Sequence, residues 1–107
     1  MKRTIKIGDR DVEMLANAAS PYIFRTLFGQ DFIKESQNPD PDVHLMEKMG
    51  FVMAMQAELP IEKLFSLDIK DFYKWLVGFD PLDVLGASEE IGKLYRDQAK
   101  NYSEPKK

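Results

Sequence analysis

Residues 4–15 read TIKIGDRDVEML, and they begin the chain with a recognisable local pattern. Apolar and polar residues alternate on both sides of the Gly-Asp pair, which predicts two short strands, near 3–7 and 11–15, joined by a tight turn. The apolar face of this hairpin consists of Ile5, Ile7, Val12 and Met14. Because a lone hairpin is only marginally stable in water, this face must pack on helices or pair with another chain through a free edge.

The residues that follow the hairpin predict a helix. The hydroxyl of Ser20 can accept a hydrogen bond from a free amide at a helix N-terminus, and Pro21 suits the first helical position, where no amide hydrogen is needed. Gly29 can end this helix in a left-handed turn, and Asp31 can cap a second, short helix. We therefore expect a sharp bend between two helices at residues 29–31.

Further helices are expected after a proline-rich loop at 38–42. Apolar residues recur at spacings of three and four over 43–58, which predicts the longest helix and the centre of the core. A dense aromatic helix is expected at 66–79, and Asp80-Pro81 repeats the cap-plus-proline start for a short helical turn. The final helix is expected to hold Ile91, Leu94, Tyr95 and Gln98.

The length and composition of the chain are those of one ordinary globular domain. Of the 107 residues, 44% are hydrophobic and 31% are charged. We predict an α+β fold that is mostly α, in which an N-terminal β-hairpin is followed by a small bundle of about five helices. The domain is expected to span 1–102, followed by a disordered tail at 103–107.

The composition argues against several classes of function. Cysteine is absent, which removes thiol nucleophiles, thiolate metal sites and disulfides, and fits a reducing cytosol. The sequence has no apolar run that suits a signal peptide or a membrane span, so we expect a cytoplasmic protein with no membrane partner. Residues 31–90 hold 13 acidic and five basic side chains, which disfavours a nucleic-acid surface.

Catalytic and metal sites find little support in the sequence. His44 is the only histidine; Asp40, Asp42 and Glu47 lie near it but lack the ligand order of an EF-hand loop. Pairs of neighbouring carboxylates are explained better by helix N-termini, whose dipole they complement. There is no glycine-rich phosphate loop and no nucleophile motif. We predict that the protein is not an enzyme and holds no catalytic residue, cofactor or metal ion.

Two groups of apolar side chains exceed what one buried helix face needs. The methionines of the central helix are either core residues or an adaptable surface for apolar partners, and Met55 falls outside the main stripe. The aromatic helix carries apolar residues on more than one side, so we expect one subset of them to be exposed. The candidate partner-binding residues are Met55, Phe72, Tyr73 and Trp75.

The order of these features resembles that of tail assembly chaperones from long-tailed phages and prophages of Gram-positive bacteria. Those proteins open with a lysine-bearing hairpin, an Ala-Thr-Pro-like helix start, an arginine four residues after the proline, and a Phe-Gly-x-Asp motif. The matching positions here are Ser20, Pro21, Arg25, Phe28, Gly29 and Asp31. Later similarities are a helix with methionine and alanine at 53–57, Trp-Leu at 75–76 and Phe-Asp at 79–80. Serine replaces the more common threonine at position 20 and keeps a capping hydroxyl.

The resemblance implies a tail-assembly-chaperone domain over 1–102 that is cytoplasmic, has no enzymatic activity and is absent from the mature virion. Its expected client is the tape measure protein, which it would bind and solubilise during tail morphogenesis. The tail tube protein and a second copy of the chain, as a homo-oligomer, are further expected partners. The alternative, from another class, is a small prophage-encoded regulatory adaptor that binds a host protein.

Overall fold

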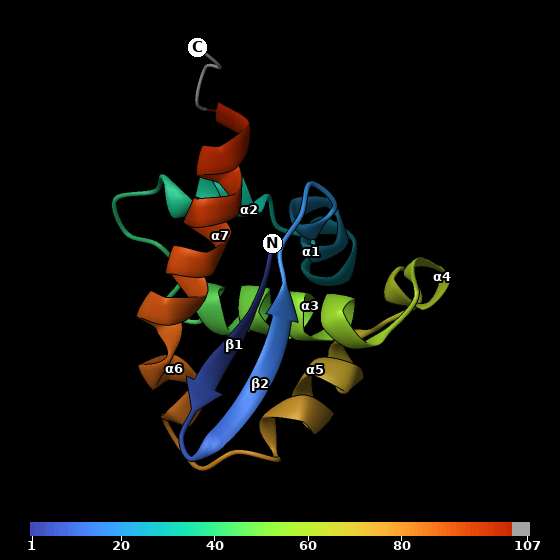
Figure 1. Cartoon of the computed structure of the whole chain (residues 1–107), viewed down its shortest axis with the longest axis vertical. Helices are drawn as coiled ribbons and strands as arrows, with labels where there is room; N and C mark the ends of the chain where they lie inside the picture. Colours follow the sequence, from blue (N-terminus) through green and yellow to red (C-terminus); the bar gives the residue numbers. More distant parts are fainter. Residues whose placement is uncertain (104–107) are drawn as a thin grey trace.

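The N-terminal hairpin lies over one long helix (Figure 1). In the computed structural model, which describes residues 1–103, strand β1 (Lys2–Ile7) pairs antiparallel with β2 (Arg10–Leu15). Gly8 has φ +63°, whereas Asp9 does not adopt a positive φ, which is the pattern of a type II′ turn with glycine at its first central position. The two predicted strands are confirmed.

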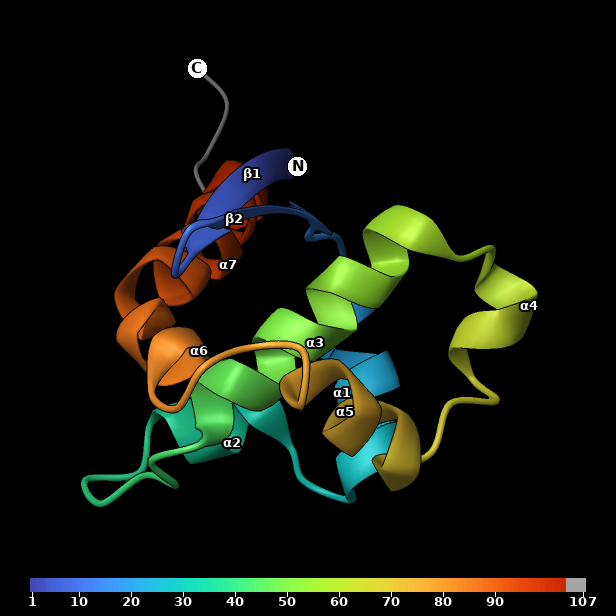
Figure 2. The ribbon, with the colours of Figure 1, turned by 90° about the horizontal axis from the view of Figure 1, so that it is seen from below.

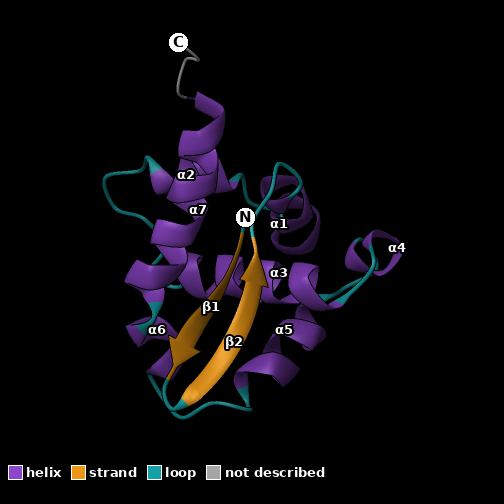
Figure 3. Cartoon of the chain, viewed as in Figure 1, coloured by secondary structure: helices purple, strands orange, loops and turns teal. Residues whose placement is uncertain are grey.

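Seven helices follow the hairpin within residues 1–103, so the fold is α+β and mostly helical, as predicted (Figure 3). They are α1 (Ser20–Phe28), α2 (Phe32–Ser36), α3 (Leu45–Glu58), α4 (Ile61–Leu64), α5 (Ile69–Leu76), α6 (Asp83–Gly86) and α7 (Ser88–Ser103). Helices α2, α4 and α6 have only five, four and four residues, too few to show a periodic apolar stripe. Helix α7 includes Ser103, the first residue of the expected tail, and 104–107 lie outside the described residues.

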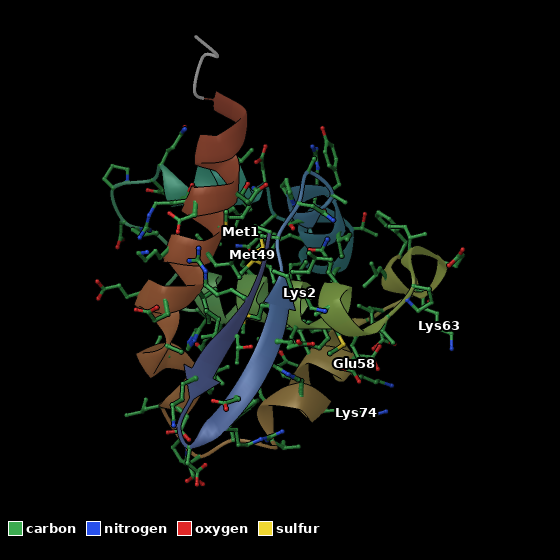
Figure 4. The ribbon with its side chains drawn as sticks, in the orientation of Figure 1. Met1, Lys2, Met49, Glu58, Lys63 and Lys74 are labelled. Atoms are coloured by element: carbon green, nitrogen blue, oxygen red, sulfur yellow. The ribbon has the colours of Figure 1, made fainter. Side chains whose placement is uncertain are left out.

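Helix α3 is the centre of the core, as predicted. Figure 2 shows it between the hairpin and α7 on one side and α1 and α2 on the other. Met49 of α3 is fully buried and is labelled in Figure 4. The side chains at most 1% exposed include Met14, Ile23, Phe24, Met49, Phe51, Val52, Met53, Ile91 and Leu94. The methionines at 49 and 53 are therefore core residues and not an adaptable surface.

The apolar face of the hairpin packs on helices of the same chain. Ile5, Ile7 and Met14 are at most 2% exposed, and β2 lies against α3 while β1 contacts α6 and α7. Val12 stands opposite Ile5 and is half-buried against the same core. The hairpin thus buries its apolar face without a second chain.

An arginine stands at each end of this buried face. Facing residues of antiparallel strands share one side of the sheet, so Arg3 and Arg10 point to the same side as Ile5. The guanidinium of Arg3 donates a hydrogen bond of 3.0 Å to Asp97 in α7. That of Arg10 donates one of 2.7 Å to the carbonyl of Gly78, and it also lies 4.5 Å from the centre of the Phe79 ring. The two arginines therefore bind one end of the hairpin to α7 and the other end to the segment just after α5.

The start of α1 corrects one prediction. Ser20 is the first residue of the helix and not its cap; Pro21 occupies the first turn, as expected. The fully buried Ser20 hydroxyl accepts a hydrogen bond of 3.1 Å from the Asn17 amide and donates one of 2.6 Å to Oε1 of Gln56. Oδ1 of Asn17 accepts hydrogen bonds of 2.9 Å from the Ala19 amide and from Nε2 of Gln56. The Asn17 side chain thus accepts from the free Ala19 amide at the helix start. The Ser20 hydroxyl is therefore available for the hydrogen bond to Gln56 that joins α1 to α3.

The bend after α1 is confirmed in detail. Gly29 has φ +69°, and its amide donates a hydrogen bond of 2.8 Å to the carbonyl of Arg25. Oδ1 of Asp31 accepts a hydrogen bond of 3.2 Å from the amide of Lys34 and so caps α2. The Phe28 ring packs at 5.0 Å from that of Phe24 in the core. Phe28, Gly29 and Asp31 therefore each have a structural role in this bend.

The helices after α3 differ from the sequence prediction. Helix α4 was not predicted, and α5 is shorter than 66–79 because Asp68 fixes its start. The Asp68 side chain accepts from the Asp71 amide, while the Asp71 side chain accepts from the Asp68 amide, forming a capping box. Helix α6 begins after Leu82, which has φ +72°, and not at Asp80-Pro81. There the backbone carbonyl of Asp80, not its side chain, accepts from the amide of residue 83.

Candidate partner-binding surface

Helix α5 packs against the core through the aromatic residues on its inner side. The Phe72 ring is 5% exposed and lies 5.2 Å from Phe28 and 5.5 Å from Phe51, in T-shaped contacts. The Trp75 ring lies 5.6 Å from Phe51 and 5.1 Å from Phe79. These contacts hold α5 against α1 and α3, and they fix which side of the helix faces solvent.

The outer side of α5 is apolar as well. Ile69, Tyr73 and Val77 are 41%, 57% and 82% exposed, and their spacing of four residues places them in one line, which we call the α5 stripe. Ile61 and Phe65, in and just after the projecting helix α4 (Figure 1), are 52% and 46% exposed. The exposed apolar side chains that line one side of α5 mark a surface that a protein partner can cover.

Lysines border the α5 stripe on its solvent side. Lys70 and Lys74 each follow a stripe residue, about 100° further round the helix, and both are exposed. Figure 4 shows Lys63 and Lys74 directed away from the body of the protein. A partner that covers the stripe therefore meets positive charge at its rim, which favours an acidic margin on that partner.

A cavity of about 430 Å³ lies between α5 and the start of α3. Its lining residues are Asp42, His44, Glu47, Lys48, Phe72, Tyr73 and Leu76. The charged groups bind one another: Nδ1 of His44 contacts Glu47, and Nζ of Lys48 donates hydrogen bonds of 2.8 Å to Asp42 and 3.0 Å to Gln30. The hydrogen bond from Lys48 lowers the pKa of the Asp42 carboxyl below its ordinary value, and so does the bond from the His44 amide.

The ionisable groups that line this cavity are paired with one another. No three histidine or carboxylate side chains within the described residues gather closely enough to hold a metal ion. His44 is exposed, and its ring is paired with Glu47 across one helical turn. The ion pair between Lys48 and Asp42 holds the loop before α3 against α3, beside the ring of Tyr73.

The structure does not bring the four predicted partner-binding residues onto one surface. Tyr73 is exposed in the α5 stripe, whereas Phe72 is buried and supports the helix from below. Trp75 is half-buried and lines a groove on the opposite side of α5 from Tyr73. Met55 is half-buried against the core. Of the four, Tyr73 is the residue that lies in the exposed α5 stripe.

Four exposed apolar residues in or just after α4 and α5 were missed in the sequence prediction. They are Ile61, Phe65, Ile69 and Val77. The spacing of four between Ile69, Tyr73 and Val77 was a usable signal, because it places the three on one side of a helix. The exposure of Ile61 and Phe65 had no such signal, since α4 was not predicted.

No protein-family model, curated protein or solved structure matches this chain. Among the described residues, no helix combines the length and the apolar character needed to cross a membrane.

Proposed function

We propose that this protein is a phage or prophage tail assembly chaperone. In this role it binds and solubilises the tape measure protein in the host cytoplasm, helps to recruit the tail tube protein and is absent from the mature virion. The α5 stripe is the observation that carries the proposal, because it is an apolar helix face that no other part of the described chain covers. The order of motifs from the hairpin to Asp31 supports it from the sequence side.

A small apolar patch suits a chaperone that must later leave its client. One stripe of three residues gives a weak contact, since binding must first offset the loss of translational and rotational freedom. Many copies along one long client gain by avidity, and each copy can still dissociate when the tube protein takes its place. Contacts between neighbouring copies would add to this effect and give a homo-oligomer on the client.

The proposal is tested by co-expression with the tape measure protein encoded in the same genome. We expect the client to stay soluble and to co-purify with several copies of the chaperone, as measured by pull-down and light scattering. Val77→Asp should abolish this effect because it places a charge in the α5 stripe. Val43→Asp is the matched control, since Val43 is 70% exposed but lies in the loop before α3.

Two results would contradict the proposal. The first is a client that aggregates to the same extent with and without this protein, and this result would favour the regulatory adaptor that binds a host protein. The second is a soluble complex that Val77→Asp and Val43→Asp affect equally, which would exclude the α5 stripe as the contact surface.

A further inference from the structure

A second surface lies on the other side of α5, along the outer edge of β2. It is a groove of about 360 Å³ between this strand and helices α3 and α5. Its lining residues are Arg10, Asp11, Val12, Glu13, Ala54, Ala57, Glu58, Trp75 and Phe79. Alanines at two positions of α3 leave space beside the rings of Trp75 and Phe79, so the groove can receive side chains as well as backbone.

The edge of β2 that faces this groove has unpaired backbone groups. β1 is the neighbour of β2 in the two-stranded sheet (Figure 1), and it lies on the other edge. Met1 and Ala16 exchange two backbone hydrogen bonds, of 2.6 and 2.8 Å, so the hydrogen-bonded pairs of the ladder include Arg3 with Met14. Asp11 and Glu13 lie between the hydrogen-bonded pairs of β2. Their amides and carbonyls therefore point away from β1. An extended segment can bond to them.

The rim of the groove is negatively charged. Carboxylates at Asp11, Glu13 and Glu58 surround it, and Figure 4 labels Glu58 at the end of α3. The one basic lining residue, Arg10, is already held by the Gly78 carbonyl and the Phe79 ring. Glu13 is already paired with Lys2, at 3.6 Å between its Oε1 and Nζ, so the free charge at the rim comes from Asp11 and Glu58, and it favours a basic occupant.

We propose that this groove binds an extended peptide segment that alternates apolar and basic residues and adds to β2 as a third strand. In such a strand, every second side chain points toward the helices, where Ala54, Trp75 and Phe79 provide an apolar surface. The intervening side chains stand on the outer face of the sheet, beside Asp11 and Glu13. The groove and the α5 stripe lie on different sides of α5, so a peptide in the groove leaves the stripe free for another partner.

The inner edge of β2 already shows which sequence it accepts. There β1 places Lys6 opposite Asp11 and Thr4 opposite Glu13, while Ile5 faces the core. A synthetic peptide with the sequence of residues 2–7, with blocked ends, is therefore a suitable probe for the outer edge. A second peptide with glutamate at its three basic positions is the control for charge.

The binding experiment uses two measurements on the intact chain. Trp75 is the only tryptophan, so its fluorescence should change as the basic peptide is added and should not change with the acidic peptide. Amide hydrogen exchange followed by NMR should show new protection at Asp11 and Glu13, since their amides become hydrogen-bonded only if a strand is added. Protection lost instead at Arg3 and Ile5, whose amides bond to β2, would mean that the peptide displaces β1, and it would overturn the proposal.

Two substitutions locate the binding site. Ala57→Leu fills the groove and should weaken binding at least tenfold, whereas Ala18→Leu, at an exposed position outside it, should not. Glu58→Lys should weaken binding by about two- to fivefold, the range expected for one exposed charge pair. Circular dichroism confirms that each variant is folded before it is titrated. No peptide binding to the parent chain, or equal binding by Ala57→Leu and Ala18→Leu, would refute the third-strand site.

Discussion

The rings of Phe72 and Tyr73 lie 5.8 Å apart, yet Phe72 is 5% exposed and Tyr73 is 57% exposed. The boundary between core and surface therefore passes between two consecutive residues of α5. Phe72 binds the helix to Phe28 and Phe51, and Tyr73 belongs to the α5 stripe. Substitutions at these two positions should separate stability from partner binding.

Phe72→Ala should lower the free energy of unfolding by about 3–5 kcal/mol, because it removes a buried ring and leaves a cavity. Tyr73→Ala should change it by less than about 0.5 kcal/mol. Urea denaturation followed by circular dichroism measures both values. Similar losses at the two positions would show that Tyr73 contributes to the core.

Ser20→Ala should destabilise the protein by about 1–3 kcal/mol, because it deprives Oε1 of Gln56 of a buried hydrogen-bond donor. The control is Ser66→Ala at an exposed position, where the hydroxyl bonds only to the Lys63 carbonyl within its own turn. It should cost less than about 0.5 kcal/mol. The two midpoints of urea unfolding give the comparison, and equal midpoints would refute a linking role for Ser20.

Gly50→Ala should destabilise the protein although alanine favours helix, because the added Cβ would lie 2.8 Å from Cδ1 of Ile91. The expected net loss is about 0–2 kcal/mol, after the helix-propensity gain of about 1 kcal/mol. Ile91→Val removes the clashing methyl group, so the double variant should be more stable than the two single losses predict. Strict additivity in this double-mutant cycle would exclude the clash.

Leu82→Asn should stabilise the protein by about 0.5–1 kcal/mol. Leu82 has φ +72°, a left-handed conformation that is unfavourable for leucine. Its side chain is 74% exposed, so little burial offsets this cost. Asparagine tolerates this conformation better than leucine does. The melting temperature by calorimetry should rise by a few degrees, and an unchanged or lower value would show that the leucine side chain contributes more than its exposure indicates.

The stability of the fold should decline in acid partly through Asp42. Its folded-state pKa is lowered by the hydrogen bond from Lys48, so the bond stabilises the fold above the ordinary carboxyl pKa of about 4. This contribution is lost as the pH falls from there through the lower folded-state pKa. Asp42→Asn should therefore be less stable at pH 7 and show a shallower decline below about pH 4. Lys48→Gln should flatten the decline in the same way, and parallel profiles for all three proteins would refute the linkage.

The sequence predicted those elements whose signals are local. The Gly-Asp turn, the glycine at position 29 and the Asp31 cap each depend on one residue and its immediate neighbours, and all three are confirmed. The 14 residues of α3 are long enough for apolar residues to recur at spacings of three and four, and this helix was predicted close to its observed bounds. The four residues of α4 gave none, so α4 was missed, and α5 was predicted too long because its capping box fixes the helix start at Asp68.

The role of Ser20 and the division of α5 depended on contacts between distant segments. The partner of Ser20 is Gln56, 36 positions away, and no local pattern indicates that their side chains meet. The sequence did predict that α5 has more aromatic residues than one buried face needs. Which of them are exposed depends on how Phe28, Phe51 and Phe79 surround the helix, and that is a property of the tertiary fold.

The hydrogen bond between Arg3 and Asp97 links positions 94 apart and thus bears on how the chain is made. A ribosome that adds about 5–20 residues per second needs roughly 5–20 s to travel from one to the other. During that time the hairpin has no α7 beside it, and Ile91 and Leu94 are not yet available to the core. Folding can therefore finish only after α7 has been synthesised, and a messenger RNA that stops before α7 would yield a nascent chain with an uncovered apolar interior.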